Sequence, residues 1–154
     1  IVQRVTVLTR EGEILELEKE KLAFGYRTSV IREKGYLVLG AELMLVPGEK
    51  GEILARMQEL KRRRVEKQPL EYPSAGSAFK RPEGYFAGKL VQDAGLSGYA
   101  VGGAKVSEKH CGFLINAGNA TASDVMELIR QIQAKVKEQF GVQLEPEIQF
   151  LGNF

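Results

Sequence analysis

The sequence lacks tryptophan altogether, and it contains a single cysteine, Cys111, and a single histidine, His110. One cysteine excludes a disulfide bond within the chain and any zinc site built on cysteine ligands. A transition-metal site would then need carboxylate ligands, and no cluster of Asp and Glu has the required spacing. We therefore expect no bound metal. The low cysteine count also favours a reducing compartment such as the cytoplasm.

Long hydrophobic runs and a strong net charge are absent as well. No apolar segment approaches the ~18 residues of a membrane-spanning helix, and nothing at the start resembles a signal peptide. The formal net charge of +2 is too small to indicate a general affinity for nucleic acid. With 44% hydrophobic and 27% charged residues, the composition is typical of a soluble globular protein. The chain opens with Ile1 rather than methionine, so we expect the true N-terminus to lie upstream.

The first part of the chain has the pattern of strands followed by a helix. Residues 1–17 hold two stretches of β-branched and apolar side chains separated by a turn, which predicts a hairpin. Residues 35–46 are apolar on both alternating faces, which predicts a strand covered on both sides. Residues 49–67 have apolar positions at helical spacing. Pro69 ends this helix and marks the boundary that we expect between two lobes.

The clearest element is a helix near the end of the chain. Thr121 and Asp124 have the spacing of a capping box. Apolar side chains then repeat at helical spacing up to Phe140, and Gly141 is the expected stop. Residues 142–151 have the pattern of a final extended segment, interrupted by Pro146. Because strands and helices follow one another in irregular order, the predicted fold class is α+β.

Residues 67–93 concentrate the candidate chemistry, with a turn of small residues around Ser77 and then aromatic and cationic side chains. On composition alone, a surface loop rich in proline and glycine is the favoured interpretation. Ser77 does not match the nucleophile of a Ser-His-Asp hydrolase, because the sequence AGSAF lacks the second glycine of the nucleophile elbow. A serine without a base can still donate a proton to a strongly basic group such as an enolate, and nearby cations would stabilise that anion.

Three other positions stand out. Arg27 follows an aromatic residue and precedes two hydroxyl residues, which suits an anion-binding corner, although an exposed loop arginine explains the pattern equally well. Pro146 stiffens the segment that holds Glu147, for which an ordinary exposed carboxylate is the simpler interpretation. His110 and Cys111 are neighbours, and adjacent residues of a strand point to opposite faces. We therefore interpret His110 as structural or substrate-orienting rather than catalytic.

Four segments taken together resemble one family. They are GYRTSV at residues 25–30, RRVEKQPLEYPSAGSAFKRPEGYFAGKLVQDAGL at 63–96, VSEKHCGFLIN at 106–116 and LEPEIQFLG at 144–152. The resemblance is to UDP-N-acetylenolpyruvoylglucosamine reductase, also called UDP-N-acetylmuramate dehydrogenase, in the branch that lacks the long tyrosine-bearing substrate loop. It covers essentially the whole chain, and its motifs are specific jointly rather than singly.

This resemblance implies an oxidoreductase of bacterial peptidoglycan synthesis. In that family NADPH reduces a bound FAD, and the flavin passes a hydride to the enolpyruvyl double bond of UDP-N-acetylglucosamine enolpyruvate, giving the lactyl ether of UDP-N-acetylmuramate. Carried onto this chain, the resemblance assigns proton donation to Ser77. It places Arg27 near the substrate carboxylate and the developing enolate, and Glu147 completes the catalytic set.

The resemblance also assigns binding roles. Tyr26, in the YR motif, would contact the substrate, and Lys67 matches the family lysine that meets the phosphates of the substrate or of the nicotinamide cofactor. Arg81 receives no catalytic role, because another branch of the family has asparagine at that position.

Most of the family's FAD-binding lobe is missing from the sequence. Residues 1–68 would be the C-terminal part of that lobe, residues 69–144 the small α+β substrate-binding lobe, and residues 145–154 a closing strand that returns to the missing N-terminal lobe. We therefore expect the chain to be a fragment that is inactive alone and does not hold FAD tightly.

Two other functions remain open from the residues. One is a non-catalytic module that binds a nucleotide sugar or another polyanion through Arg27, Lys67 and Lys80. The other is a helix that contacts RNA through the basic run at residues 61–64, although cations near a helix C-terminus are usually a solvated face that opposes the helix dipole.

Overall fold

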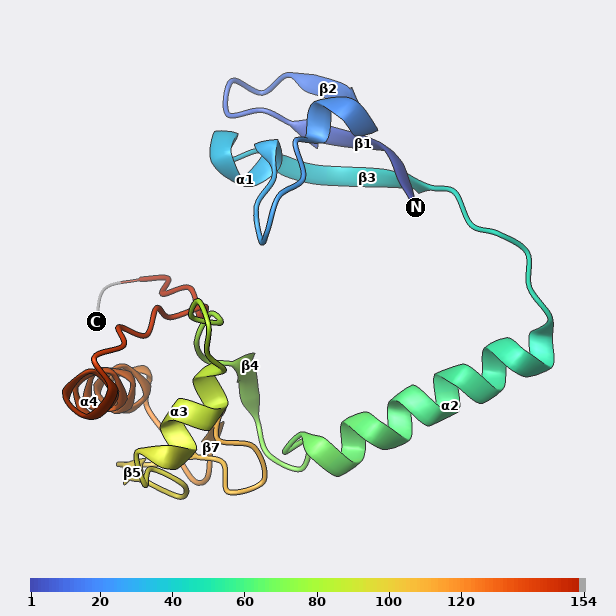
Figure 1. Ribbon diagram of the computed structural model, residues 1–154. Coiled ribbons are helices and arrows are strands. Elements are labelled where there is room, and N and C mark those ends of the chain that lie inside the picture. Colours follow the sequence, from blue (N-terminus) through green and yellow to red (C-terminus); the bar gives the residue numbers. More distant parts are fainter. Residues whose placement is uncertain (153–154) are drawn as a thin grey trace. The chain divides into compact units, whose positions relative to one another are not determined.

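The computed structural model describes residues 1–152. The chain divides into two compact units, Ile1–Ile53 and Leu54–Phe154. We call them the first unit and the second unit and describe each by itself. Figure 1 traces the order of the helices and strands along the chain.

The first unit contains a three-stranded antiparallel sheet in the order β2-β1-β3. The strands are β1 (Val2–Leu8), β2 (Ile14–Glu18) and β3 (Leu37–Leu43). The N–H of Thr9 donates to the carbonyl oxygen of Glu13 at 2.8 Å and closes the turn between β1 and β2. The predicted hairpin is therefore confirmed.

Two short helices cover part of this sheet. The 3-10 helix η1 (Lys19–Leu22) contacts β1 and β2, and α1 (Val30–Lys34) contacts η1. The resulting core is small, with Val5, Val7 and Leu22 buried at its centre.

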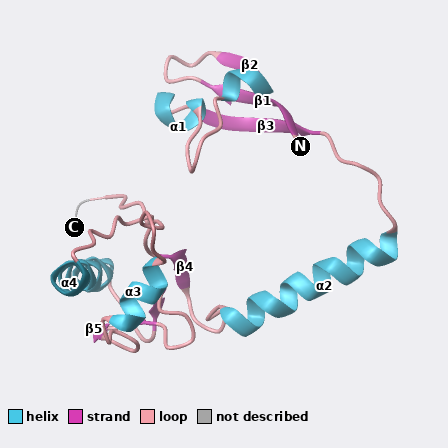
Figure 2. Cartoon of the chain, viewed as in Figure 1, coloured by secondary structure: helices cyan, strands magenta, loops and turns pink. Residues whose placement is uncertain are grey.

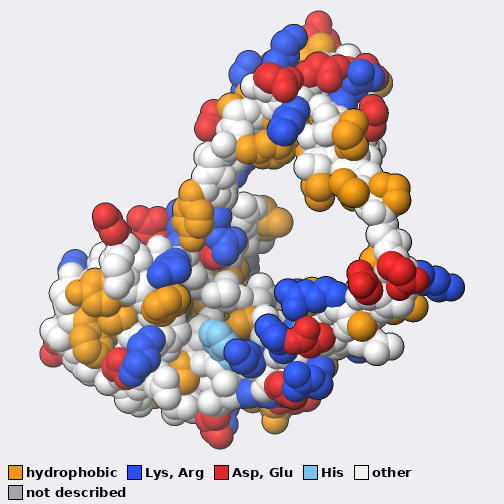
Figure 3. All heavy atoms as spheres, turned by 45° about the vertical axis from the view of Figure 1, so that its right-hand side comes forward, with side chains coloured by type: hydrophobic (Ala, Val, Ile, Leu, Met, Phe, Trp, Pro, Cys, Tyr) orange, Lys and Arg blue, Asp and Glu red, His pale blue; other side chains and the backbone are white. Residues whose placement is uncertain are grey.

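Strand β3 lies at the edge of the sheet and is exposed. The side chains of Leu37, Val38 and Leu39 are 61%, 49% and 50% exposed, and Figure 3 shows hydrophobic side chains, in orange, on the visible face of the first unit. The prediction that this strand is covered on both sides is wrong for the described residues. An apolar pattern indicates that a strand needs cover, but in the first unit η1 packs over β1 and β2, and α1 packs on η1.

Helix α2 (Lys50–Lys67) begins in the first unit and continues in the second. It confirms the helix predicted from residues 49–67, but none of its residues is buried. Its charged side chains pair along the helix, as in the contact of 2.7 Å between Arg62 Nη1 and Glu66 Oε1. Pairs of this kind at i,i+4 on an exposed helix contribute little, about 0.3–0.5 kcal/mol.

The second unit contains a four-stranded sheet in the order β4-β7-β6-β5, with antiparallel neighbours. Its strands are β4 (Ser74–Ser77), β5 (Ala100–Val101), β6 (Ala104–Val106) and β7 (Phe113–Asn116), and its remaining helices are α3 (Ala87–Asp93) and α4 (Ala122–Phe140). Figure 2 distinguishes the two kinds of element. The predicted α+β class is confirmed.

Helix α4 provides one wall of the core of the second unit. The side chain of Thr121 accepts from the backbone of Asp124, whose carboxylate accepts in turn from the backbone of Thr121, so the predicted capping box is confirmed. Leu128, Ile132 and Val136 recur at helical spacing and are fully buried. Gly141 ends the helix in a left-handed conformation, which a residue without Cβ adopts at low cost.

The segment after α4 pairs with the chain near β4. Its pairing in the described residues is an isolated bridge between Phe79 and Pro146 rather than a full strand. Residues 153 and 154 of the predicted closing strand lie outside the described residues. The lobe boundaries at residues 68–69 and 144–145, and the return of the last segment to another lobe, stay predictions.

Candidate active site

Ser77 ends strand β4, which is built from small residues. Gly76 has a φ of +87°, a value that glycine adopts without steric cost. The pairing of β4 with β7 is irregular between Ser74 and Ser77. The hydroxyl of Ser74 donates to the carbonyl oxygen of Leu114 at 2.9 Å and accepts from the N–H of Gly76 at 3.1 Å. These contacts hold the turn, and Ser77 itself is exposed.

The segment around Pro146 lies alongside the residues that follow Ser77. The N–H of Glu147 donates to the carbonyl oxygen of Ala78 at 2.9 Å. Two residues further on, the N–H of Lys80 donates to the carbonyl oxygen of Glu145 at 2.8 Å. Because Ala78 directly follows Ser77, the structure brings Glu147 to the strand that carries the candidate proton donor.

Lys80 and Glu145 also pair through their side chains. The Nζ of Lys80 lies 2.9 Å from Oε2 of Glu145. This hydrogen bond and the positive charge hold the pKa of the Glu145 carboxyl below its ordinary value. Since both side chains are well exposed, the pair contributes little stability. It does, however, engage one of the cations predicted for a polyanion-binding module.

The aromatic side chains that follow Ser77 separate into a buried one and two exposed ones. Phe79 belongs to the core, whereas Tyr85 and Phe86 are exposed. The guanidinium of Arg81 lies 4.0 Å from the centre of the Phe86 ring, and its Nε donates to the carbonyl oxygen of Tyr85 at 3.2 Å. Arg81 is thus held within its own loop by a cation–π contact and a hydrogen bond.

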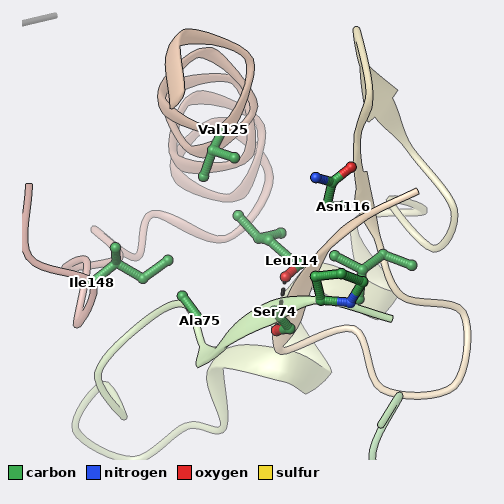
Figure 4. Close-up of a pocket in the computed structure, with 8 residues that line it drawn as sticks. Ser74, Ala75, Leu114, Asn116, Val125 and Ile148 are labelled. Atoms are coloured by element: carbon green, nitrogen blue, oxygen red, sulfur yellow. Dashed lines mark hydrogen bonds between the residues drawn. The ribbon is translucent and has the colours of Figure 1, made fainter. Parts of the chain in front are cut away.

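A small pocket of about 200 Å³ lies beside β4 (Figure 4). Its walls come from four separate parts of the sequence, namely Pro73, Ser74, Ala75, Leu114, Ile115, Asn116, Val125 and Ile148. In Figure 4, Val125 of α4 and Ile148 of the closing segment face the pocket from the side opposite Ser74. Sequence reasoning missed this pocket, because no local pattern shows that these segments meet.

In the first unit, Arg27 sits in a tight turn. Gly25 and Thr28 exchange backbone hydrogen bonds of 3.0 and 3.4 Å, and Arg27 has a φ of +57°, in the left-handed region that non-glycine residues rarely occupy. Its guanidinium carbon lies 5.9 Å from the centre of the Tyr26 ring. The turn therefore places the guanidinium of Arg27 beside the exposed ring of Tyr26, and the anion-binding role of this corner stays a prediction.

A hollow of about 280 Å³ adjoins this turn, lined by Phe24, Gly25, Arg27, Thr28, Ser29 and Arg32. The Nη1 atom of Arg32 donates to the carbonyl oxygen of Arg27 at 3.1 Å. Two arginines thus line one hollow, and arginine is the residue type best suited to binding a carboxylate or phosphate. Sequence reasoning missed Arg32, although its position five residues after Arg27, across a turn, is a signal that would have placed the two together.

The remaining predicted residues are Lys67 and His110. Lys67 is the last residue of α2 and is exposed. His110 is exposed whereas Cys111 is buried, and both lie in the loop between β6 and β7 rather than on a strand. Across the described residues no group of three or more His, Cys, Asp or Glu side chains could hold a metal ion.

Of the predicted catalytic residues, Ser77 and Glu147 both belong to the second unit, in which the backbone N–H of Glu147 bonds to Ala78, the residue after Ser77. Arg27 and Tyr26 belong to the first unit. The catalytic set as a whole therefore stays a prediction. Over residues 1–152, no helix is both long and apolar enough to cross a membrane.

Comparison with known proteins identifies the family of the chain. The family model described as "UDP-N-acetylenolpyruvoylglucosamine reductase, C-terminal domain" matches residues 68–151, which is more than half of the chain. The chain belongs to the UDP-N-acetylenolpyruvoylglucosamine reductase family. The resemblance seen in the four sequence segments is thereby confirmed.

Curated relatives carry the same family name. The chain is 58% identical over 151 residues to the UDP-N-acetylenolpyruvoylglucosamine reductase of Lachnoclostridium phytofermentans, covering 98% of this chain and 49% of the relative. It is 59% identical over 149 residues to that of Agathobacter rectalis, covering 97% of this chain and 48% of the relative. The chain therefore spans about half the length of the curated relatives it matches.

A solved structure is also similar. The crystal structure of UDP-N-acetylenolpyruvylglucosamine reductase from Thermus caldophilus matches with a TM-score of 0.79 and 38% sequence identity, covering 96% of this chain and 52% of that one. The α+β class is thus shared with a protein of the same family.

Proposed function

We propose that the chain is the proton-donating part of a flavin-dependent NADPH reductase of peptidoglycan precursor synthesis. The reaction reduces the enolpyruvyl group of UDP-N-acetylglucosamine enolpyruvate to the lactyl ether of UDP-N-acetylmuramate. The contact that carries the proposal is the hydrogen bond of 2.9 Å from the N–H of Glu147 to Ala78, because it holds a carboxylate residue beside the strand of Ser77. Membership of the reductase family supports the same assignment.

Reduction of a carbon–carbon double bond adds a hydride to one carbon and a proton to the other. The Ser77 hydroxyl supplies the proton: its O–H bond breaks, a C–H bond forms, and the negative charge passes from the enolate to the serine oxygen. This transfer is favourable because an enolate carbon is a stronger base than an alkoxide. Ser77 is exposed, so solvent can return a proton to its oxygen before the next cycle.

Binding and charge stabilisation come from the other assigned residues. Arg27 neutralises the substrate carboxylate and the developing enolate, and the guanidinium of Arg32 adds charge in the same hollow. Tyr26 contacts the substrate, and Lys67 binds phosphate groups of the substrate or of NADPH. Glu147 completes the catalytic set.

We expect tight binding of FAD to need residues that this chain does not supply. Neither hollow beside the candidate residues, of about 200 and 280 Å³, reaches the volume of about 300–1,000 Å³ that is usual for pockets of drug-sized ligands. The family resemblance assigns the hydride to FAD reduced by NADPH. Purified chain is expected to carry less than one flavin per molecule by absorbance. Stoichiometric, tightly bound yellow flavin would contradict this expectation.

The partner implied by this argument is the other half of the relatives' length. We propose that this half packs against the exposed strand β3, where Leu37, Val38 and Leu39 are about half exposed. Covering apolar surface of this kind stabilises the complex by about 25 cal/mol per Å². Joining the chain to the half of the Lachnoclostridium phytofermentans relative that it does not span should slow hydrogen exchange of β3. Unchanged exchange in β3 would contradict the assignment.

The compartment assigned to this activity is the cytoplasm. The single cysteine, Cys111, is buried, which suits a reducing environment. The substrate and partners are a nucleotide sugar and NADPH, and the proposal involves neither nucleic acid nor a membrane.

Ser77→Ala in that joined, full-length protein tests the function. Substrate turnover should fall about 10²–10⁴-fold because general acid catalysis is lost, while reduction of the flavin by NADPH is kept. Ser97→Ala, at another exposed serine, is the matched control and should leave both rates unchanged. A Ser77→Ala variant that turns over substrate at the rate of the control would overturn the assignment.

Turnover and binding measurements separate the two alternative functions. A non-catalytic module for nucleotide sugars predicts substrate binding with no turnover to lose. RNA binding through residues 61–64 predicts an affinity that falls steeply with salt, and no binding at low ionic strength would remove it.

A further inference from the structure

His110 makes a contact that the proposed chemistry does not use. Its ring nitrogen Nδ1 accepts a hydrogen bond from the backbone N–H of Gly112 at 3.1 Å. The backbone N–H of His110 donates to the hydroxyl of the buried Ser107 at 3.3 Å. The His110 and Phe113 rings pack in a T-shaped arrangement with their centroids 5.0 Å apart. The residue is therefore held at its backbone N–H, through the contact with the Phe113 ring and at one ring nitrogen.

Two glycines make room for this ring. A Cβ on Gly112 would lie 2.9 Å from Cε1 of His110, close enough that an atom would have to shift, and 3.1 Å from Nδ1, which is also a tight contact. A Cβ on Gly88, in helix α3, would lie 3.0 Å from the backbone nitrogen of Gly112 and 3.3 Å from Cε1 of His110. The loop, the helix and the ring are thus closely packed at both glycines, and a side chain at either position would require its neighbours to shift.

From Gly112, hydrogen bonds lead to the candidate active site. The carbonyl oxygen of Gly112 accepts from the N–H of Ala78 at 2.8 Å, and the carbonyl oxygen of Ala78 accepts from the N–H of Glu147 at 2.9 Å. Ala78 is the residue that follows Ser77. Three successive hydrogen bonds therefore connect the imidazole of His110 with Glu147, and one of the residues between them, Ala78, is bonded covalently to Ser77.

We propose that His110 is a positioning residue, which fixes Ser77 relative to Glu147 through Gly112 and Ala78. The atom through which it acts is Nδ1, which accepts the hydrogen bond from the N–H of Gly112. The contact with Gly112 stands independently of the reaction, while its effect on turnover rests on the proposed function.

Three substitutions at position 110 separate this role from simple packing. In His110→Asn the amide oxygen is as many bonds from the backbone as Nδ1 is, so it can accept from the N–H of Gly112. In His110→Gln the amide group lies one bond further out, and in His110→Ala there is no acceptor. If the position of the acceptor atom matters, the Asn variant should behave like the wild type and the Gln and Ala variants should not. If only packing matters, Gln should replace His110 better than Asn does, because its side chain is larger.

Backbone hydrogen exchange of the chain, followed by NMR, is the first measurement. The amides of Gly112, Ala78 and Glu147 should exchange about two- to tenfold faster in the Ala and Gln variants, the range expected for loss of one hydrogen bond. They should return towards the wild-type rate in the Asn variant, and the Ile132 amide in α4 should stay unchanged as a folding control. Equal rates in the Asn and Ala variants, or faster exchange throughout α4, would overturn the proposal.

Turnover of the joined, full-length protein is the second measurement. The Ala and Gln variants should lose about ten- to a hundredfold in kcat, because a small displacement of a reacting group has effects of this size, with the KM for NADPH unchanged and recovery in the Asn variant. A kcat that is unchanged in all three variants would overturn the link to Ser77. If Ser77→Ala itself leaves turnover intact, the proposed function fails, while the exchange pattern still decides whether His110 holds Gly112.

Discussion

In the second unit, α4 buries Leu128, Ile132 and Val136 against the sheet, whereas in the first unit β3 leaves Leu37 and Val38 about half exposed. Both sheets are antiparallel and both sequences are apolar enough to need cover. The second unit finds that cover in its own helices, and its core extends from Phe79 near β4 to Leu144 after α4. The first unit covers β1 and β2 only in part, through η1, on which α1 packs.

This difference indicates where stability resides. The second unit contains the whole match to the family's C-terminal domain and supplies its own core, so substitutions in its interior should be costly. The exposed strand of the first unit should tolerate the same substitutions, because removing an exposed side chain leaves no cavity.

Truncating one leucine in each unit is the strongest test of the comparison. Leu128 is fully buried, and Leu39 is 50% exposed. Leu128→Ala should lower the free energy of unfolding of the second unit by about 2–5 kcal/mol, and Leu39→Ala should change stability by less than about 0.5 kcal/mol. Urea unfolding combined with hydrogen exchange of each unit measures both. Similar losses at the two positions would show that β3 is already covered.

Two glycines give a second test. A Cβ on Gly103 would overlap the carbonyl oxygen of Gly118 and lie 2.5 Å from the nitrogen of Ala120, whereas a Cβ on Gly40 in β3 would meet nothing within 4 Å. Gly103→Ala should therefore cost about 1–3 kcal/mol, as overpacking does. Gly40→Ala should stabilise by roughly 0.5–1 kcal/mol, because glycine weakens a strand. Thermal unfolding reports both, and destabilisation by Gly40→Ala would mean that this face of β3 is occupied.

Helix caps provide a third, smaller contrast. The Thr121 side chain accepts a hydrogen bond at the start of α4, whereas Ser29, at the start of α1, makes no such bond. Thr121→Ala should cost about 1 kcal/mol, and Ser29→Ala should cost much less. Urea midpoints measured for the two variants decide the point, and equal shifts would contradict it.

The smallest expected effect is a loss of stability of the second unit at acid pH. Hydrogen bonds from the Thr121 backbone and side chain hold the pKa of the Asp124 carboxyl below its ordinary value. A lowered pKa in the folded state stabilises the fold above the unfolded pKa, about 3.9 for Asp, and this contribution is lost as the pH falls through the folded pKa. Unfolding between pH 7 and pH 2 should show this loss, and Asp124→Asn should remove that part of the pH dependence. A variant with the wild-type pH profile would exclude Asp124 as a cause.

Local signals in the sequence predicted the elements that local contacts build. The capping residues and apolar spacing of α4 lie within one segment, and so do the two strands and the turn of the hairpin. Cover for β3 was mispredicted, because an apolar pattern states a requirement that other residues must meet. Tertiary contacts are a different matter: the pocket beside β4 draws on four segments, and no pattern in any one of them shows that they meet.

The candidate site was predictable to a similar extent. Residue types alone identified Ser77 as a serine without a base, and the family resemblance selected it together with Glu147. The hydrogen bond that joins Glu147 to Ala78 is visible only in three dimensions. The contact between His110 and Gly112 spans two residues, but a histidine in a loop has no pattern that reveals which ring nitrogen accepts.

Position 27 has a consequence for protein engineering. Arg27 holds a φ of +57°, and a side chain in that conformation costs roughly 1–2 kcal/mol that glycine would avoid. A stability-guided redesign would therefore replace this arginine first. The same replacement would remove the charge that the turn presents, so at this one residue a more robust protein and a better anion receptor demand opposite choices.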